Sequence, residues 1–342
     1  MTKWLDGIAI DEDVVISTRV RVARNIAKYK FPSYMTVDES DSLTDDILNS
    51  MKDIVDDNYK FIRLRDIIPR DQMVYIEDHL ISPSLIERKD KSSFLIRNDE
   101  RATIMINEED HIRIQTLFPG FNLIDTWNLC SDIDDKLSEK LDYAYDDKWG
   151  YLTACPTNVG TGLRASVMLH LPCITMAKTI NSLIEGLREI GLTARGLYGE
   201  GSEALGNLYQ ISNQVTLGQS EEDIIEKLNK VVYQIIQRER KTREYLKDKK
   251  TIEVENMVYR SYGVLSHARI MNSKEAITHL SNLRLGWEMG LFKNEKIKDI
   301  FKLMIEIQPA NIQKEFDRDM VDEDRDIMRA TKIREYIDNL EG

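Results

Sequence analysis

The sequence predicts an α+β fold, with a mixed domain over residues 1–245 and an all-helical domain over residues 246–342. Short apolar runs with the composition of strands occur early in the chain. Helical periodicity dominates after residue 220. Of the 16 glycines and 7 prolines, only four glycines and one proline lie beyond residue 218. Because these residues mark turns, their scarcity there favours long helices over short strands.

Strands and helices are predicted from apolar patterning. Ser220, followed by three acidic residues, has the pattern of a helix N-cap with an acidic first turn. The apolar residues from Ile224 to Ile236 then fall on one face, which predicts a helix running to about Leu246. The expected strands are Val14–Ile16, Phe94–Ile96, Thr103–Ile106 and Val167–Leu171, and the later helices are Val254–Met271, Lys274–Met289, Glu295–Glu306 and Val321–Leu340.

Composition and charge exclude several classes of protein. A net charge of −12 gives no broad basic surface for nucleic acid or an anionic membrane, so neither is an expected partner. No apolar stretch approaches the ~18 residues that span a bilayer, and the acidic N-terminus does not resemble a secretory signal. Cys130, Cys155 and Cys173 form neither a disulfide framework nor a metal-ligand pattern. We therefore expect a cytoplasmic protein, with Cys130 and Cys173 in its core and no protein-held metal.

Three segments carry residues suited to the chemistry of a guanidinium group. Cys155–Ser166 reads CPTNVGTGLRAS, Asn107–Arg113 reads NEEDHIR, and Arg195–Gly201 reads RGLYGEG. A guanidinium is planar and charged, and it is a poor nucleophile because its lone pair is delocalised. Its phosphorylation requires carboxylates that grip the N–H fork and a base that accepts a proton. It also requires cations that neutralise the phosphates.

These segments contain each of the required groups. Glu109 can supply the first carboxylate and the base, Glu200 the second carboxylate, and Cys155 a thiolate. The glycines in Gly160–Gly162 would let backbone N–H groups approach a phosphate closely. The available cations are Arg19, Arg21, Arg113, Arg164 and Arg195.

Each of these signals also has an ordinary structural explanation. A Glu-Glu-Asp triplet is usually a solvated turn, and a lone cysteine is usually a small buried hydrophobe. Gly199-Glu200-Gly201 is also compatible with a tight loop alone. Arg19 and Arg21 share one face of a strand, as paired arginines on surface strands often do. None of the signals decides the function individually.

In combination, the segments resemble the phosphagen kinases, the creatine and arginine kinase family. The resemblance covers about residues 10–235, and its most specific part is Cys155–Ser166. It implies a large antiparallel sheet flanked by helices and an ATP-dependent phosphoryl transfer to a guanidinium. The matching blocks, in the order of the family, are Ser17–Arg21, Asp78–His79, Asn107–Arg113, Cys155–Ser166 and Arg195–Glu200.

The resemblance also implies a role for each matching residue. Glu109 and Glu200 would hold the guanidinium, with Glu109 the better candidate for the base, and Cys155 would contact it. The arginines would bind the nucleotide phosphates and His79 would lie beside the adenosine, while Mg²⁺ would be held mainly through the phosphates. The implied nucleotide-binding residues are Ser17, Thr18, Arg19, Val20, Arg21, His79, Arg113, Arg164, Ala165, Ser166, Val167, Met168, Arg195, Gly196, Leu197, Tyr198 and Gly199.

Three departures from the small-molecule phosphagen kinases favour a protein substrate. The Arg19-x-Arg21 block stands near the start of the chain, without the helical domain that precedes it in the family and helps to enclose a small substrate. Tyr198 stands where many relatives have an arginine. A helical extension follows residue 245, where those relatives have almost ended. A site without one wall would admit an arginine on a polypeptide.

The extension contains a motif suited to phosphoarginine. In Arg325-Asp326-Ile327-Met328-Arg329-Ala330, the two arginines are i, i+4 neighbours on a helix and Asp326 lies three residues before Arg329. Two arginines can grip a phosphoryl group while Asp326 holds a guanidinium. A charged surface helix is the ordinary alternative. The motif Arg-Asp-x-x-Arg-Ala and the segment Arg195–Ala204 resemble the bacterial protein-arginine kinases over nearly the whole chain.

This second resemblance implies partners and regulation. It implies phosphorylation of exposed arginines in proteins, and delivery of those proteins to a Clp-type chaperone–protease in the stress response and protein quality control. It also implies an activator protein, self-phosphorylation, allosteric control and a homo-oligomer built partly through the phosphoarginine-binding residues Arg325, Asp326, Arg329 and Ala330. Two other functions stay open from the residues: a small-molecule guanidino kinase, and a catalytically silent reader of phosphoarginine.

Overall fold

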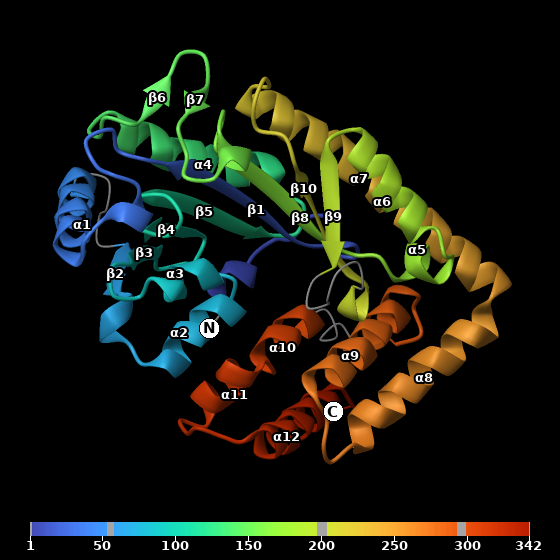
Figure 1. Ribbon diagram of the computed structural model, residues 1–342. Coiled ribbons are helices and arrows are strands. Elements are labelled where there is room, and N and C mark those ends of the chain that lie inside the picture. The colour runs from blue at the N-terminus through green and yellow to red at the C-terminus, as the bar shows by residue number, and fades with distance from the viewer. Residues whose placement is uncertain (1, 53–57, 197–203, 293–298, 342) are drawn as a thin grey trace.

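The centre of the molecule is an antiparallel sheet of eight strands (Figure 1). This computed structural model describes residues 2–52, 58–196, 204–292 and 299–341. The strand order is β2-β3-β4-β5-β1-β8-β10-β9, so β1 lies in the interior between β5 and β8. The strands are β1 Val15–Arg24, β2 Tyr59–Arg63, β3 Ser93–Arg97, β4 Ala102–Ile106, β5 Ile112–Pro119, β8 Leu163–His170, β9 Leu192–Gly196 and β10 Leu208–Asn213, with β6 Tyr145–Asp146 and β7 Gly150–Tyr151 in a separate hairpin.

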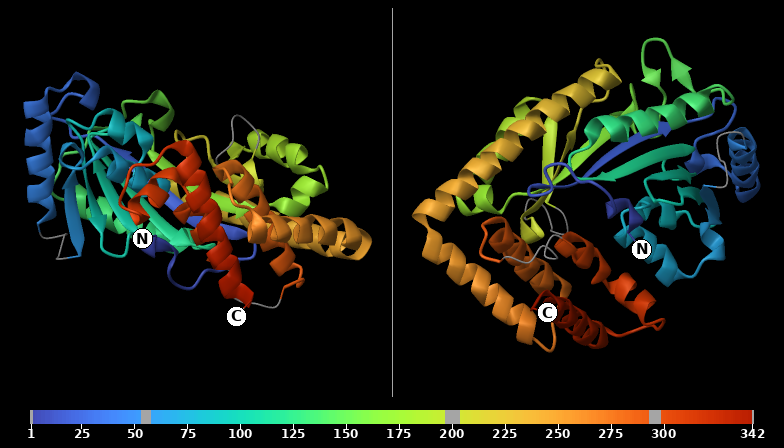
Figure 2. Two further views of the ribbon diagram at one scale, coloured as in Figure 1. Left: turned by 90° about the horizontal axis from the view of Figure 1, so that it is seen from below. Right: turned by 180° about the vertical axis from the view of Figure 1, so that it is seen from behind.

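Helices cover the sheet and then continue beyond it as a group of their own (Figures 1 and 2). The group formed by α8 to α12 lies at one end of the sheet, below the edge where β1, β8 and β10 emerge in Figure 1. The helices are α1 Val37–Met51, α2 Pro69–Glu77, α3 Pro83–Glu87, α4 Leu123–Ser138, α5 Pro172–Met176, α6 Ile180–Glu189, α7 Glu221–Lys249, α8 Thr251–His267, α9 Ser273–Glu288, α10 Ile300–Glu306, α11 Pro309–Glu315 and α12 Asp322–Glu341.

One face of the sheet is mainly apolar at its centre and forms the main core. Val20 and Val22 of β1 alternate with the polar residues of that strand and point into this core, where they are fully buried. Trp127 of α4 and Leu228 of α7 pack against them from the covering helices. Each such buried side chain contributes about 1.5–3 kcal/mol. The packing of α4 and α7 stabilises this face of the sheet, and the opposite face is available for polar groups.

The other face carries two separate apolar clusters with a polar strip between them. The first cluster joins α2 and α3 to strands β2 to β5, through residues such as Leu85 and Phe94. The second joins the helices α8 to α12 to the ends of β1 and β10, through Ile16 and Leu208. The polar strip is formed by residues of β1, β5 and β8 between these clusters, and it is the part of this face that is available for a binding site.

The long helix α7 connects the sheet to the helical group. A capping box at its start, in which Ser220 accepts from the N–H of Asp223 and the Asp223 carboxylate accepts from the N–H of Ser220, fixes where it begins. It runs without a break through residue 245 to Lys249, and α8 begins at Thr251. Arg243 near its end is bound by the carboxylate of Asp13, with 3.0 Å between Nη1 and Oδ2. The N-terminal segment is therefore held by charge to the helix that leads into the helical group.

The fold class expected from the sequence is confirmed: a large antiparallel sheet flanked by helices, followed by helices alone. The helices predicted after residue 220 are present with shifted ends, and β1, β3, β4 and β8 contain or overlap the predicted strands. Helix α11 was not expected, nor were β2, β5, β9 and β10. Across the described ranges, none of the helices combines the length and the apolar character that crossing a bilayer would require.

Removing the buried Arg24 should strongly destabilise the fold. Its guanidinium lies 2.6 Å from Asp134 of α4 and 3.5 Å from the centre of the Tyr151 ring. The change Arg24→Ala would leave Asp134 buried and without its partner, so we expect the free energy of unfolding to fall by about 3–5 kcal/mol in urea titrations. The matched control is Lys136→Ala on the same helix, which loses an exposed ion pair with Asp132 and should cost under about 1 kcal/mol. Equal losses in the two variants would contradict the assignment.

Candidate active site

The polar strip of the sheet is lined with arginine. On β1, Arg21 lies opposite Arg164 of β8 and Gln115 of β5, and Arg19 lies opposite Ser166 and Leu117. Directly opposed residues of antiparallel strands point to the same face. The register therefore places all five of the expected cationic residues on one face: Arg19 and Arg21 on β1, Arg113 on β5, Arg164 on β8 and Arg195 on β9.

These arginines repel one another. Burial, followed by the charges of Arg164 and Arg113, lowers the pKa of Arg19 to about 10. Burial, followed by the charges of Arg19, Arg113 and Arg164, holds the pKa of Arg21 well below its usual value. Burial, Arg195 and Arg113 lower the pKa of Arg164. Within the described residues, Nε of Arg19 is buried without a hydrogen-bond partner. A face with unbalanced positive charge and an unfilled donor fits a bound anion such as a polyphosphate.

Four of the expected nucleotide-binding residues do not belong to this face. Val20, Ala165 and Val167 point to the opposite side and are buried in the main core. Thr18 also alternates away from it, and its hydroxyl donates to the carbonyl of Gly120 at 2.8 Å. Their side chains therefore build the strands that carry the arginines, and we assign them no side-chain contact with a ligand.

A small pocket continues the strip toward α2. His79 closes one side of it, beside Arg19 of β1. Burial, and then the charge of Arg19, lowers the pKa of His79 to about 4, so its ring is neutral at physiological pH. The other residues that line the pocket are Ser17, Leu117, Ser166, Met168 and Gln210. Apart from the charged Arg19, its lining is neutral and partly apolar, which would suit a flat heterocycle next to the charged strip once the pocket, about 10 Å³ in this structure, has widened.

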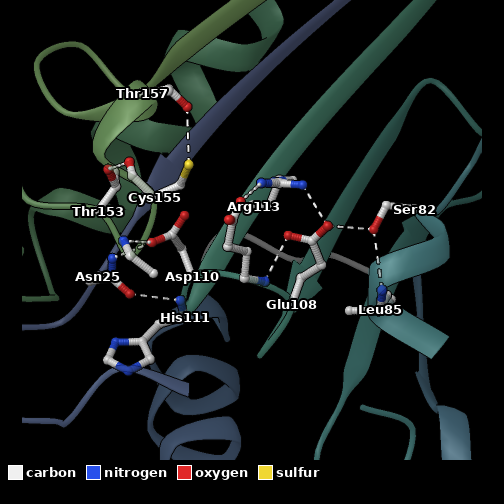
Figure 3. A network of polar contacts seen from close by, with 12 residues as sticks. Asn25, Ser82, Leu85, Glu108, Asp110, His111, Arg113, Thr153, Cys155 and Thr157 are labelled. Atoms are coloured by element: carbon white, nitrogen blue, oxygen red, sulfur yellow. Dashed lines mark hydrogen bonds and ion pairs between the residues drawn. The ribbon is translucent and has the colours of Figure 1, made fainter. Parts of the chain in front are cut away.

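The turn between β4 and β5 holds three carboxylates with three different environments (Figure 3). Glu108 is buried and forms an ion pair with Arg113 at 2.5 Å, and it also accepts a hydrogen bond from Ser82. Glu109 is 40% exposed and lies 3.2 Å from the same arginine. Glu108 therefore orients Arg113, while Glu109 keeps an accessible carboxylate at the site. Sequence reasoning selected Glu109 and missed Glu108.

Asp110 connects this turn to the loop that carries Cys155 (Figure 3). Its Oδ1 accepts from the backbone N–H of Ala154 at 2.6 Å and from the side chain of Asn25 at 2.7 Å. Burial raises the pKa of Asp110, although these hydrogen bonds oppose the shift. The neighbouring His111 also binds the backbone of residues 26 and 30 through its two ring nitrogens. The distance between Glu109 and Cys155 is thus fixed by a buried polar network.

The Cys155 loop is held rigidly against the end of the sheet. Cys155 is half-buried, and its Sγ lies 3.0 Å from Oγ1 of Thr157. The expected exposure of backbone N–H groups in Gly160–Gly162 is only partly met, because the N–H of Thr161 already donates to the carbonyl of Thr216. Gly160 has φ +112°, and a Cβ there would lie 2.2 Å from that same carbonyl oxygen. The glycine is therefore needed for close packing of the loop against its own chain.

Comparisons with known proteins agree with this architecture. Residues 41–242 match the family model for the C-terminal catalytic domain of ATP:guanido phosphotransferases. The chain belongs to the ATP:guanido phosphotransferase family. Among solved structures of similar fold, lombricine kinase aligns with a TM-score of 0.61 and 26% identity over 70% of each chain. The duplicated taurocyamine kinase from Schistosoma mansoni, with bound transition-state analogue components, aligns with a TM-score of 0.63 and 26% identity over 72% of this chain and 36% of its own.

Within the ATP:guanido phosphotransferases, the most informative relatives match from end to end. A protein-arginine kinase from Halalkalibacterium halodurans is 46% identical over 98% of this chain and 94% of its own. Those from Clostridium tetani and Bacillus subtilis are 43% and 44% identical, over 99% and 98% of this chain and 99% and 93% of theirs. Residues 251–342 also match the model for the C-terminal domain of the protein-arginine kinase McsB.

The remaining residues expected from the family are Arg195 and Gly196 at the end of β9 and the four residues that follow them in sequence. Arg195 is exposed and Gly196 is the last residue of β9. Leu197, Tyr198, Gly199 and Glu200 lie outside the described residues.

The C-terminal motif lies on α12, in the part that matches the McsB domain. Arg329 is buried: its Nε donates to the carbonyl of Ile307 at 2.9 Å, and its Nη1 donates to the carbonyl of Met271 and pairs with Asp326. Arg325 is more open, with 23% of its side chain exposed, and it pairs with Asp322. Ala330 packs in the core of the helical group. Asp326 and Arg329, three residues apart on α12, pair with each other, and Arg329 also joins three parts of the helical group.

Replacing one arginine of the strip should stabilise the protein and remove anion binding. Arg21 is held charged against burial and cationic neighbours, so Arg21→Met should raise the free energy of unfolding by about 1 kcal/mol. It should also abolish the increase in Tm that Mg-ADP gives to the wild-type protein. Arg97→Met is the control, because Arg97 is paired with Asp99 at 2.7 Å and lies away from the strip. A destabilised Arg21→Met variant, or one that keeps the full response to Mg-ADP, would contradict this electrostatic account.

Proposed function

We propose that this protein is an ATP-dependent protein-arginine kinase, which transfers the γ-phosphoryl group of ATP to the guanidinium of arginine side chains in proteins. The observation that carries the proposal is the geometry of the strip. Arg19 and Arg21 line the sheet without an ion pair among the described residues. The β4–β5 turn presents an accessible Glu109, and Asp110 of the same turn fixes the loop that carries Cys155. The full-length similarity to protein-arginine kinases supports arginine in proteins as the acceptor.

The proposed reaction gives each residue a role. Glu109 binds N–H groups of the substrate guanidinium and accepts one proton, so that a lone pair forms on the attacking nitrogen. That nitrogen forms a bond to the γ-phosphorus as the bond from phosphorus to the bridging oxygen breaks and ADP leaves. Cys155 orients the guanidinium, and Glu200 supplies the second carboxylate. Arg19, Arg21, Arg113, Arg164 and Arg195 neutralise the phosphates and the transition state.

The nucleotide would lie along the strip with its base toward His79. The unfilled Nε of Arg19 fits a phosphate oxygen, and the neutral ring of His79 fits an uncharged base. Mg²⁺ bound to the phosphates would supply further neutralisation of charge. In the part of the chain that the structure describes, no group of three or more His, Cys, Asp or Glu side chains is arranged to hold a metal ion. In the proposed scheme, Mg²⁺ is held by the phosphates and water.

We also propose a division of labour along the chain. Residues 1–245 would carry catalysis, and residues 246–342 would bind phosphoarginine through Arg325, Asp326, Arg329 and Ala330 and contribute to a homo-oligomer. In this scheme the enzyme acts in the cytoplasm under allosteric control, with an activator protein. Its products, proteins marked by phosphoarginine, go to a Clp-type chaperone–protease during the stress response and protein quality control.

The direct test is incubation of the protein with Mg-ATP and an unfolded, arginine-containing protein, followed by assay of acid-labile phosphate. We expect label on the protein substrate and little on free arginine. Glu109→Gln should keep the nucleotide affinity and lower the rate by about 10²–10⁴-fold, because a positioned base is lost. Glu139→Gln, at an exposed position at the end of α4, is the control.

The outcomes separate the three candidate functions. Label only on free arginine would establish a small-molecule guanidino kinase. No label on either acceptor, together with tight binding of phosphoarginine, would establish a reader without catalysis. Wild-type turnover in Glu109→Gln would remove Glu109 from the catalytic residues.

The phosphoarginine site is best tested at Arg325. Arg329 binds two main-chain carbonyls and Asp326 inside the helical group. Arg329→Ala should therefore lower the free energy of unfolding by about 3 kcal/mol, and a loss of binding in that variant could not be separated from a loss of stability. Arg325→Ala should change it by under about 1 kcal/mol while weakening phosphoarginine binding about tenfold or more, measured by calorimetry. Unchanged affinity in a folded Arg325→Ala variant would refute the assignment.

A further inference from the structure

The end of α2 caps the start of α11, a helix more than 230 residues away in sequence. The carboxylate of Glu77 accepts from the backbone N–H groups of Ala310 and Asn311, both at 2.8 Å. The side-chain amide of Asn311 returns to α2, donating to Glu77 at 3.2 Å and to Asp78 at 3.0 Å. The helical group therefore holds the last turn of α2 through Ala310 and Asn311, and Asn311 supplies the side-chain contacts.

That last turn leads directly to His79, the residue that closes the pocket beside Arg19. His79 adopts a left-handed backbone conformation, with φ +62°, which costs a non-glycine residue roughly 1 kcal/mol or more. Such a conformation persists only where the surroundings fix it. His79 is thus displayed by a strained turn, and its position depends on the contacts of the residues on either side.

Three contacts from separate parts of the chain fix this turn. Nε1 of Trp4 donates to the carbonyl of Asp78 at 3.0 Å, and the Trp4 ring meets the His79 ring edge-on, with 6.4 Å between centroids. The side-chain amide of Gln115 on β5 donates to the carbonyl of His79 at 2.8 Å. The amide of Asn311 holds the Asp78 carboxylate. Of the three, only Asn311 comes from the helical group.

We propose that Asn311 is a positioning residue for nucleotide binding, so that the nucleotide pocket is completed by a helix of the C-terminal group. Asn311 does not reach the pocket; it acts through Asp78 on the backbone of His79. This inference rests on the proposed function, since it takes the pocket at His79 and Arg19 to hold the nucleotide base. It assigns to the helical group a part in binding ATP, in addition to any binding of phosphoarginine.

The α2–α11 interface supplies a matched control for this role. Lys314, one turn further along α11, pairs with Asp71 in the first turn of α2 at 2.6 Å. This contact also joins the two helices, but it lies at the opposite end of α2 from His79. Loss of the Lys314 pair should therefore loosen the same interface without releasing the turn.

The test compares Asn311→Ala, Lys314→Ala and His79→Ala in the full-length protein, with Mg-ADP affinity measured by calorimetry and the KM for ATP measured with protein substrate. We expect Asn311→Ala to raise the Kd for Mg-ADP and the KM for ATP about five- to tenfold while kcat stays within about twofold. Lys314→Ala should bind Mg-ADP like the wild type. Because Asn311 acts through His79, the double variant Asn311→Ala/His79→Ala should bind no more weakly than His79→Ala alone.

Each outcome has a distinct meaning. Wild-type affinity in Asn311→Ala, or the same loss of affinity in Lys314→Ala, would overturn the positioning role and leave the proposed function intact. Additive losses in the double variant would also overturn it, because they would mean that Asn311 acts independently of His79. Failure of the wild-type protein to bind Mg-ADP would instead overturn the proposed function, and this inference with it.

Discussion

Repulsion among the arginines on one face of the sheet is the constraint on which the rest of the structure depends. A guanidinium keeps its proton under almost all conditions, so crowded arginines cannot relieve the repulsion by becoming neutral. The chain must hold them together by other means. It places Arg19 and Arg21 on β1, an interior strand that is hydrogen-bonded on both sides, and packs the opposite face of that strand into the main core. The free energy of that core opposes the repulsion and leaves the cations ready for an anion.

Among the described residues, the acidic side chains near the strip form ion pairs with only one of its arginines, Arg113. Glu108 is buried against Arg113, which is thereby balanced and oriented, whereas Arg19 and Arg21 form no ion pair within the described residues. Asp110 is turned away toward Asn25 and Ala154 and serves the Cys155 loop. A fuller set of counter-ions would stabilise the apo protein and compete with the phosphates. The distribution of carboxylates therefore favours ligand binding over the stability of the empty site.

The arginine strip could be predicted from sequence because its spacing pattern is local. The contacts that orient the neighbouring carboxylates could not, because they come from distant parts of the chain. Arg19 and Arg21 are two apart on a strand, and that spacing alone places them on one face. The difference between Glu108, Glu109 and Asp110 could not be predicted, since three adjacent carboxylates look alike until Ser82, Arg113 and Ala154 are brought to them from elsewhere. A motif match does not separate the two faces of a strand. It therefore predicts nucleotide contacts for Val20, Ala165 and Val167, whose side chains lie in the main core.

In the helical group, too, the sequence pattern does not reveal the contacts between distant segments. Arg325 and Asp326 in an acidic stretch suggest an exposed helix, and the periodicity of α12 does not reveal that Arg329 reaches Ile307 and Met271 in the interior. Nor does the seven-residue helix α11 stand out by its pattern, since its N-terminal capping groups come from Glu77. Arg329 binds main-chain carbonyls inside the helical group, and Glu77 of α2 binds main-chain N–H groups of α11. Helix α11 therefore belongs structurally to the domain that carries the arginine strip, because its contacts help to fix the conformation of the His79 turn.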